Sequence, residues 1–260
     1  MVFKRGKRVV PHVTDTARVV AITGAGAGLG AATARRFAAQ GDRVVVVDVD
    51  EDAAMETAGS IEADGGTAIA VQADVSDAKD VESFVERAVD EFGRLDVLHN
   101  NAGVPQQSTP VEGVTEATWD RIQDVNLKSA FLGAKYAVAH LRETEGLILN
   151  TASTAGIRPR TGLSAYCASK GGMIALTKQL AHELAADGLR VNAICPVAAD
   201  TDMLPAFTSD YLSVADMADT IPLGRLAEPE DVAGAAVFLA SPDAAMVTGT
   251  ALEVDGGRDI

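Results

Sequence analysis

Short apolar segments alternate with longer amphipathic segments along most of the chain. Seven runs rich in Val, Ile and Leu have the length of strands: 18–23, 43–48, 67–71, 95–100, 147–151, 189–195 and 251–254. Six segments between them repeat apolar residues with helical spacing: 29–40, 50–64, 77–92, 118–142, 164–187 and 229–240. Pro229 suits a first helical position, and Gly41 and Gly93 stand where helices end. The pattern therefore predicts repeated βαβ units.

Such units place parallel strands in one sheet and cover both faces with helices. No Pro/Ser-rich linker interrupts the alternation. We therefore expect an α/β fold with a doubly wound, seven-stranded parallel sheet, a Rossmann fold, in one domain over residues 18–260. Residues 1–17 form a basic N-terminal extension, with Lys4, Arg5, Lys7 and Arg8 against one acid, Asp15. Next to an acidic body, this extension is more typical of a solvated or self-docking segment than of a nucleic-acid-binding tail.

Composition narrows the class of protein further. The 260 residues are 47% hydrophobic and 23% charged, as in compact globular proteins, and the net charge is −15. Because so acidic a surface repels phosphates and anionic lipids, we expect neither a nucleic-acid nor a membrane partner. Two cysteines, Cys167 and Cys195, cannot form a disulfide framework, and the apolar runs fall short of the about 20 residues of a membrane span. A cytoplasmic location is expected.

A glycine-rich turn follows the first predicted strand. Residues 23–30 read Thr-Gly-Ala-Gly-Ala-Gly-Leu-Gly and lead straight into a predicted helix. Glycines there allow a tight turn and bring backbone N–H groups at a helix N-terminus close to a pyrophosphate. A turn that only packs helix on strand would have the same composition. The strand–turn–helix setting favours dinucleotide binding by Gly24, Gly28, Leu29 and Gly30.

Asp48 ends the second predicted strand. A carboxylate at this position can accept hydrogen bonds from the adenosine ribose, although it can also cap the following helix, a role open to Asp50 as well. The glycine turn contains no basic residue. Since the carboxylate would repel the 2′-phosphate of NADP, we expect NAD as the cofactor.

Tyr166 and Lys170 stand four residues apart and so share one face of the predicted helix 164–187. An ammonium about 4 Å from a phenol could lower its pKa from about 10 by about 3 units, which would suit acid–base chemistry near neutrality. A helical Tyr beside a Lys is also common in surface packing. Ser153, just after the strand 147–151, lies at the sheet edge where such folds bind ligands.

Together these residues resemble the short-chain dehydrogenase/reductase family, from about residue 18 to 257. The residues that carry the resemblance are Thr23, Gly24, Gly28, Gly30, Asp74-Val75, Asn100-Asn101-Ala102-Gly103, Asn126, Ser153, Tyr166, Lys170, Pro196, Thr248-Gly249 and Asp255-Gly256-Gly257.

The resemblance implies a role for each matched residue. Tyr166 would be the general acid/base, Lys170 would lower its pKa and hold the nicotinamide ribose, and Ser153 would polarise the substrate carbonyl. Asn126 would position a relay water. Cofactor contacts are implied for Asp74, Val75, Asn101, Ala102, Gly103, Pro196 and Thr201. Taken singly, Asn126 could cap a kink, Asp74 a turn, and Asn100-Asn101 could close the fourth strand.

Three residues depart from the family pattern or invite another interpretation. Val197, in Cys-Pro-Val, replaces a usual glycine and could alter the loop beside the nicotinamide. His99 replaces a usual small apolar residue and is expected to be packed rather than catalytic. Cys167 is expected to be a small core residue, because no His is spaced to activate it.

We therefore expect an NAD-dependent oxidoreductase that interconverts a secondary alcohol and a ketone, without a metal. The predicted lid, about residues 197–219, has apolar residues and acids but no cation, which favours a neutral substrate. An NADPH-dependent 3-oxoacyl reductase and a non-catalytic dinucleotide-binding module remain alternatives. By analogy with the family, the helices 118–142 and 164–187 should pair subunits in a homotetramer.

Overall fold

A computed structural model of the chain describes residues 17–208 and 213–260. The basic extension predicted for residues 1–17 lies outside the described residues, except for Ala17. So do Asp210 and Tyr211 of the predicted lid.

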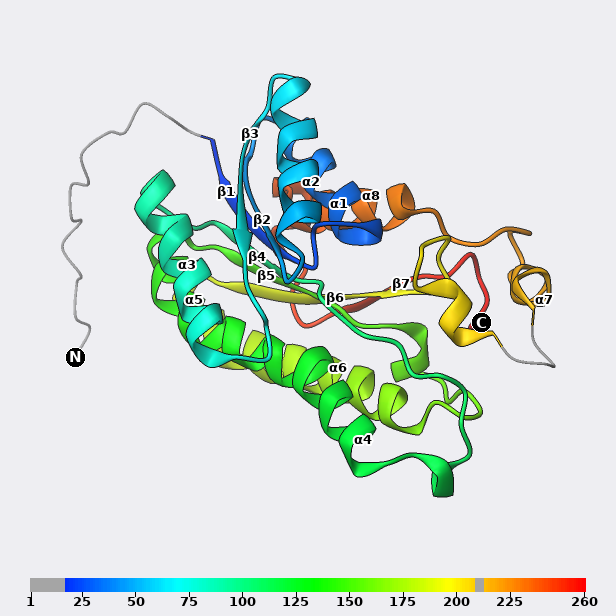
Figure 1. Cartoon of the computed structure of the whole chain (residues 1–260). Coiled ribbons are helices and arrows are strands. Elements are labelled where there is room, and N and C mark those ends of the chain that lie inside the picture. The colour runs from blue at the N-terminus through cyan, green and yellow to red at the C-terminus, as the bar shows by residue number, and fades with distance from the viewer. Residues whose placement is uncertain (1–16, 209–212) are drawn as a thin grey trace.

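Seven parallel strands form one sheet in the order β3-β2-β1-β4-β5-β6-β7 (Figure 1). The strands are β1 (Val19–Thr23), β2 (Arg43–Asp48), β3 (Thr67–Gln72), β4 (Val97–Asn100), β5 (Leu147–Thr151), β6 (Arg190–Pro196) and β7 (Ala251–Val254). The doubly wound α/β sheet expected from the sequence is confirmed. Neighbouring β1 and β4 lead to helices on opposite faces, which leaves a crevice at their carboxyl ends.

Helices cover both faces of the sheet (Figure 1). They are α1 (Gly28–Ala38), α2 (Glu51–Ala63), α3 (Ala78–Phe92), α4 (Glu116–Gln123), α5 (Ser129–Thr144), α6 (Ser164–Leu184), α7 (Val214–Asp219) and α8 (Pro229–Ala240). Residues of α1, α2 and α8 pack in one apolar cluster, and residues of α3, α5 and α6 pack in another on the opposite face. Within the described residues, no helix has the length and apolar character needed to cross a bilayer.

Burial on both faces explains why the strands read as continuous apolar runs. On β1, Val19 and Ala21 join the cluster of α3 and α5, whereas Val20 and Ile22 join the cluster of α1 and α8. All four side chains are fully buried. A parallel strand between two helical layers has no solvent-facing side, so it lacks the polar alternation of a surface strand.

The long helix predicted over 118–142 is interrupted. A π-helical turn, Asp124–Lys128, separates α4 from α5. The buried Asn126 side chain lies in this turn, where its Oδ1 accepts from the Val104 N–H at 2.7 Å and its Nδ2 donates to the Val104 carbonyl at 2.9 Å. These two bonds hold the wide turn against the segment that follows β4. The apolar spacing predicted a helix but carried no sign of the wider turn.

Helix α7 was not predicted from the apolar pattern. It is short and begins with a capping box, in which the Ser213 hydroxyl accepts from the Asp216 N–H and the Asp216 carboxylate accepts from the Ser213 N–H. Capping therefore defines its start, in a helix of only six residues.

Candidate active site

A cavity of about 670 Å³ lies at the carboxyl edge of the sheet. Fifteen of the sixteen site residues predicted from the sequence are in its wall: Gly24, Gly28, Leu29, Gly30, Asp48, Asp74, Val75, Asn101, Ala102, Gly103, Ser153, Tyr166, Lys170, Pro196 and Thr201. Asn126 is completely buried behind the wall. Residues from six different strand ends thus share one space, although this placement does not test their roles.

The glycine turn is closely packed against the rest of the site. Gly24 and Gly28 have positive φ angles of 62° and 51°. A Cβ on Gly24 would lie 2.8 Å from the Ala102 Cα, and a Cβ on Gly30 would collide with the Gly24 carbonyl. Helix α1 has no side-chain cap, so backbone N–H groups of its first turn face the cavity at the positive end of the helix. The turn fits a pyrophosphate.

Asp48 is fixed beside this turn by two backbone N–H groups. Its Oδ2 accepts from Gly26 at 2.8 Å and its Oδ1 from Asp50 at 3.1 Å. The N-cap of α2 is Asp50, whose carboxylate accepts from the Ala53 N–H. Asp50, and not Asp48, therefore caps α2. The Asp48 carboxylate lies in the cavity wall.

Asn101 connects three strand ends through its amide. Its Nδ2 donates to the carbonyls of Thr23 and Gly24 at 3.0 and 3.1 Å, and its Oδ1 accepts from the Thr151 hydroxyl at 3.1 Å. Because the protein itself uses the amide, the backbone of 101–103 is what this segment offers to a bound molecule. The cofactor contact predicted for Asn101 to Gly103 remains a prediction.

Asp74 is held in a local turn after β3. Its Oδ1 accepts from the Ser76 hydroxyl at 2.7 Å and from the Ser76 N–H at 2.9 Å, and these two bonds lower the pKa of the Asp74 carboxyl. Asp74 therefore stays ionised at neutral pH beside Val75 in the cavity wall. Asp74 thus caps a local turn, as the sequence allowed, and it also lies in the cavity wall.

Ser153, Tyr166 and Lys170 meet on one side of the cavity. Ser153 follows β5, while Tyr166 and Lys170 lie one turn apart on α6. The Lys170 ammonium is 5.8 Å from the centre of the Tyr166 ring and donates to the Thr151 carbonyl at 2.7 Å. The Phe207 ring packs edge-on against Tyr166, with ring centres 5.2 Å apart. Phe207 belongs to the predicted lid, 197–219, where it was expected as an apolar residue facing the substrate.

Burial changes the pKa of both titratable groups. It raises the pKa of Tyr166 to about 12, with the Ser153 hydroxyl acting in the opposite direction, and it lowers the pKa of Lys170 to about 8. The expected lowering of the Tyr166 pKa by Lys170 is thus not found in this structure. The reason is geometric: the ammonium is bonded to the Thr151 carbonyl rather than to the phenol. Near neutrality, Tyr166 is a protonated donor.

Asn126 reaches the catalytic helix indirectly. Its Nδ2 lies 3.4 Å from the Ser169 hydroxyl, which in turn donates to the Tyr166 carbonyl at 2.8 Å. A Cβ on Gly103 would be 3.4 Å from the Asn126 Oδ1 and 3.6 Å from the Lys170 Nζ. The Asn126 amide and the Lys170 ammonium therefore lie on either side of Gly103. Its relay role remains a prediction.

The segment after β6 lies next to the glycine turn and forms part of the cavity wall. A Cβ on Gly28 would come within 3.3 Å of the Thr201 Cγ2, so Thr201 lies directly over the turn. Val197 is buried, packs with Ile221 and Ala227, and has no positive φ angle. The loop therefore tolerates valine without backbone strain at this position.

His99 is packed, as expected from the sequence, but it also belongs to a buried hydrogen-bonded chain. Its Nε2 lies 2.8 Å from the Thr151 Oγ1, which donates to Asn101. Since Thr151 gives its proton to Asn101, His99 donates through Nε2, and its buried Nδ1 has no hydrogen-bond partner among the described residues. Complete burial lowers the pKa of His99 to about 3.

This low pKa predicts acid-sensitive stability. Between pH 6.5 and 3 the unfolded state binds a proton at His99 that the folded state does not, so stability is full above pH 6.5 and falls as the pH drops. From pH 6.5 to 5 the loss is up to about 2 kcal/mol. Urea unfolding should show this loss in the wild type and not in His99→Val. Equal pH dependence in both proteins would contradict it.

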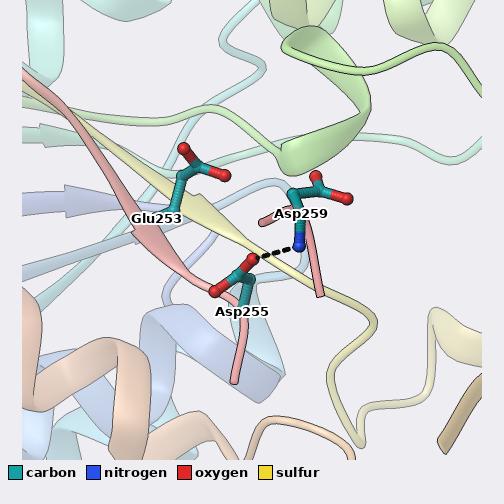
Figure 2. A group of neighbouring side chains, drawn as sticks. All are labelled: Glu253, Asp255 and Asp259. Carbon is teal, nitrogen blue, oxygen red and sulfur yellow. Dashed lines mark hydrogen bonds between the residues drawn. The ribbon is translucent and has the colours of Figure 1, made fainter. Parts of the chain in front are cut away.

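An acidic cluster lies at the carboxyl end of β7. Carboxylate oxygens of Glu253, Asp255 and Asp259 lie within 4.8 Å of one another. Figure 2 shows the Asp255 carboxylate turned toward the backbone nitrogen of Asp259, which donates to it at 2.8 Å. Asp259 is 3.0 Å from the Arg160 guanidinium. Two of the three carboxylates are thus already bonded within the protein, and we assign no metal to them.

A family model described as enoyl-(acyl carrier protein) reductase matches residues 24–259. With the relatives below, this match shows that the chain belongs to the short-chain dehydrogenase/reductase family, and it is an oxidoreductase. It is 41% identical to 4-formylbenzenesulfonate dehydrogenase of Comamonas testosteroni, over 94% of this chain and 98% of that protein. It is 40% identical to meso-2,3-butanediol dehydrogenase of Serratia marcescens, over 92% and 94%.

A solved structure is also similar. The 3-ketoacyl-(acyl-carrier-protein) reductase of Brucella melitensis, complexed with NADH, has a TM-score of 0.88 and 44% sequence identity. The match covers 94% of this chain and 98% of that one. The structural match and the sequence matches thus identify the same family and the same fold.

Proposed function

We propose that the protein transfers a hydride between NAD(H) and a secondary alcohol or ketone. One observation carries this proposal: Ser153, Tyr166 and Lys170 are in the wall of the same cavity as the glycine turn and Asp48. Family membership and the dehydrogenase names of the relatives support it.

The chain's own residues hold the substrate oxygen and move its proton. NAD(H), held by the glycine turn and Asp48, would supply the hydride chemistry at the substrate carbon. Ser153 donates a hydrogen bond to the substrate oxygen, and Tyr166 takes up or gives the hydroxyl proton. Lys170, with its pKa lowered to about 8 by burial, would hold the nicotinamide ribose. Asn126 positions the relay water.

Asp48 is the residue that selects NAD. Two N–H groups already neutralise part of its charge, and its remaining acceptor capacity faces the cavity. The NADH in the Brucella melitensis structure supports the same choice for this chain. Asp74 and Val75 are assigned to the adenine, 101–103 to the adenosine-side sugar and phosphates, and Pro196 and Thr201 to the nicotinamide.

A 3-oxoacyl reductase is the second candidate, because the similar solved structure has that name. It predicts reduction of an acyl-carrier-bound ketone. The two functions are separated by the substrate series and not by the fold, since both use the same site.

The test is a screen of secondary alcohols with NAD and with NADP, followed by NADH or NADPH absorbance. We expect NADH from at least one alcohol class and little NADPH. A protein that binds NAD but oxidises no alcohol and reduces no ketone would support the non-catalytic module instead.

We also propose that residues 18–260 form one catalytic domain and that the protein is a cytoplasmic homotetramer. The thiols of Cys167 and Cys195 are free, which supports a reducing location. Exposed Trp119 on α4 and Phe131 on α5 support subunit contacts on that face. Light scattering checks the assembly, and a monomer would contradict it.

A further inference from the structure

Of the arginines in the cavity wall, Arg160 and Arg258 come from distant parts of the chain. Arg121 acts on Asp74 instead. Arg160 lies 3.4 Å from the Thr154 hydroxyl, and Thr154 directly follows Ser153. Because Ser153 is the group assigned to the substrate oxygen, this positive end of the cavity lies on the substrate side, away from Asp48 and the glycine turn.

The charge of Arg160 is already balanced by the protein. Asp259, whose side chain is only 4% exposed, accepts from Arg160 at 3.0 and 3.2 Å. Arg158 approaches the same carboxylate at 3.9 Å, and its side chain is half exposed. The nearby Asp255 carboxylate accepts from the Gly257 and Asp259 N–H groups. The carboxylates of Asp259 and Asp255 are thus bonded to groups other than Arg258.

Arg258 has no such partner. Its side chain is partly buried and forms no hydrogen bond or ion pair with any described residue. Burial, followed by repulsion from Arg160, lowers the pKa of Arg258, and attraction by Asp259 and Asp255 does not offset this. Taking a guanidinium from water without a hydrogen-bonded anion is unfavourable, and an anion entering the cavity would relieve the penalty.

The cavity wall also contains apolar side chains from the segment after β6 and from α7. These are Met203, Leu204, Phe207 and Met217, and Phe207 packs on the Tyr166 ring. Asp202 is also in the wall, but it is exposed, so water screens its charge. The cavity is therefore shaped for an apolar body with a hydroxyl or carbonyl at one end.

We propose that Arg258 binds an anionic oxyacid group, a carboxylate or sulfonate, at the other end of the substrate. The inference deepens the proposed function and rests on it. The expectation of a neutral substrate came from the lid segment 197–219, which has no cation. Arg258 follows β7 and lies outside that segment, and only the fold brings it into the cavity.

The test compares 4-hydroxycyclohexanecarboxylate with its uncharged isostere, 4-hydroxycyclohexanecarboxamide, and with 4-hydroxycyclohexanesulfonate. We expect the wild-type kcat/KM to favour an acid over the amide at least about tenfold. A charge-assisted hydrogen bond corresponds to about 10- to 150-fold, so Arg258→Gln should remove most of this ratio, and Arg258→Lys should keep part of it. The sulfonate arm shows which oxyacid is preferred.

Arg158→Gln is the matched control, because it removes one positive charge near Asp259 without touching the cavity wall. It should leave the acid-to-amide ratio unchanged. An equal fall in Arg158→Gln and Arg258→Gln, or a wild type that prefers the amide, would overturn the proposal.

Binding separates this proposal from the proposed function. Calorimetry of the NADH-loaded protein with cyclohexanecarboxylate should show binding that Arg258→Gln weakens at least about tenfold. If the probe binds in this way but no alcohol is oxidised, the proposed function fails and the assignment of Arg258 stands. If alcohols are oxidised but the probe does not bind, the assignment of Arg258 fails alone.

Discussion

Tyr166→Phe is expected to lower turnover by about 100- to 10,000-fold while NAD binding changes little. The substitution removes the hydroxyl that exchanges a proton with the substrate, a contribution of that size for general acid–base groups. The ring remains packed against Phe207, and Lys170 keeps its bond to the Thr151 carbonyl. Steady-state kinetics with an alcohol found in the screen gives the rate, and calorimetry gives the NAD affinity.

Tyr136→Phe is the control for this change. Tyr136 lies on α5 outside the cavity, with its hydroxyl near the Lys135 ammonium, so its removal should leave turnover within about a factor of two. Retention of more than a tenth of wild-type turnover by Tyr166→Phe would remove Tyr166 from its assigned role.

Asp48→Ala is expected to move the cofactor preference toward NADP by about a hundredfold. Two phosphate charges facing one carboxylate at about 4 Å, with an effective dielectric of about 20, repel by up to about 8 kcal/mol. A third of this, about 2.7 kcal/mol, corresponds to that ratio. NAD binding should weaken by about 1.5–3 kcal/mol through loss of the ribose bond. The measurement is kcat/KM for both cofactors at low and high salt, because the repulsion is screened.

Asp50→Ala provides the control for Asp48→Ala. Asp50 caps α2, so its removal should lower stability by about 1 kcal/mol without changing the cofactor ratio. A wild type that prefers NADP, or an unchanged ratio in Asp48→Ala, would show that Asp48 does not choose the cofactor.

The sheet could be predicted from the sequence because strands that are buried on both faces appear as continuous apolar runs. The buried runs such as 43–48 match β2 residue for residue, and the glycine turn lies where β1 meets α1. Site residues next to strand ends could be placed for the same reason: in a parallel sheet, all carboxyl ends reach one edge.

Features that depend on packing between distant segments could not be predicted. The π-helical turn at Asn126 depends on Val104, 22 residues away, and Arg258 enters the cavity only after β7 has joined the sheet. The pKa of Tyr166 depends on burial and on the Thr151 carbonyl, which competes for Lys170. None of these contacts leaves a periodic signal in the chain.

The hydrogen-bonded chain through Asn101 links the two halves of the site. It runs from the Gly24 carbonyl through the Asn101 amide to Thr151, whose carbonyl holds Lys170. A substitution anywhere along this chain should therefore change KM for NAD and kcat together, so cofactor affinity and turnover cannot evolve separately there. Asp48, on β2, lies outside the chain. A substitution at Asp48 can thus alter cofactor selectivity without changing the residues that transfer the proton.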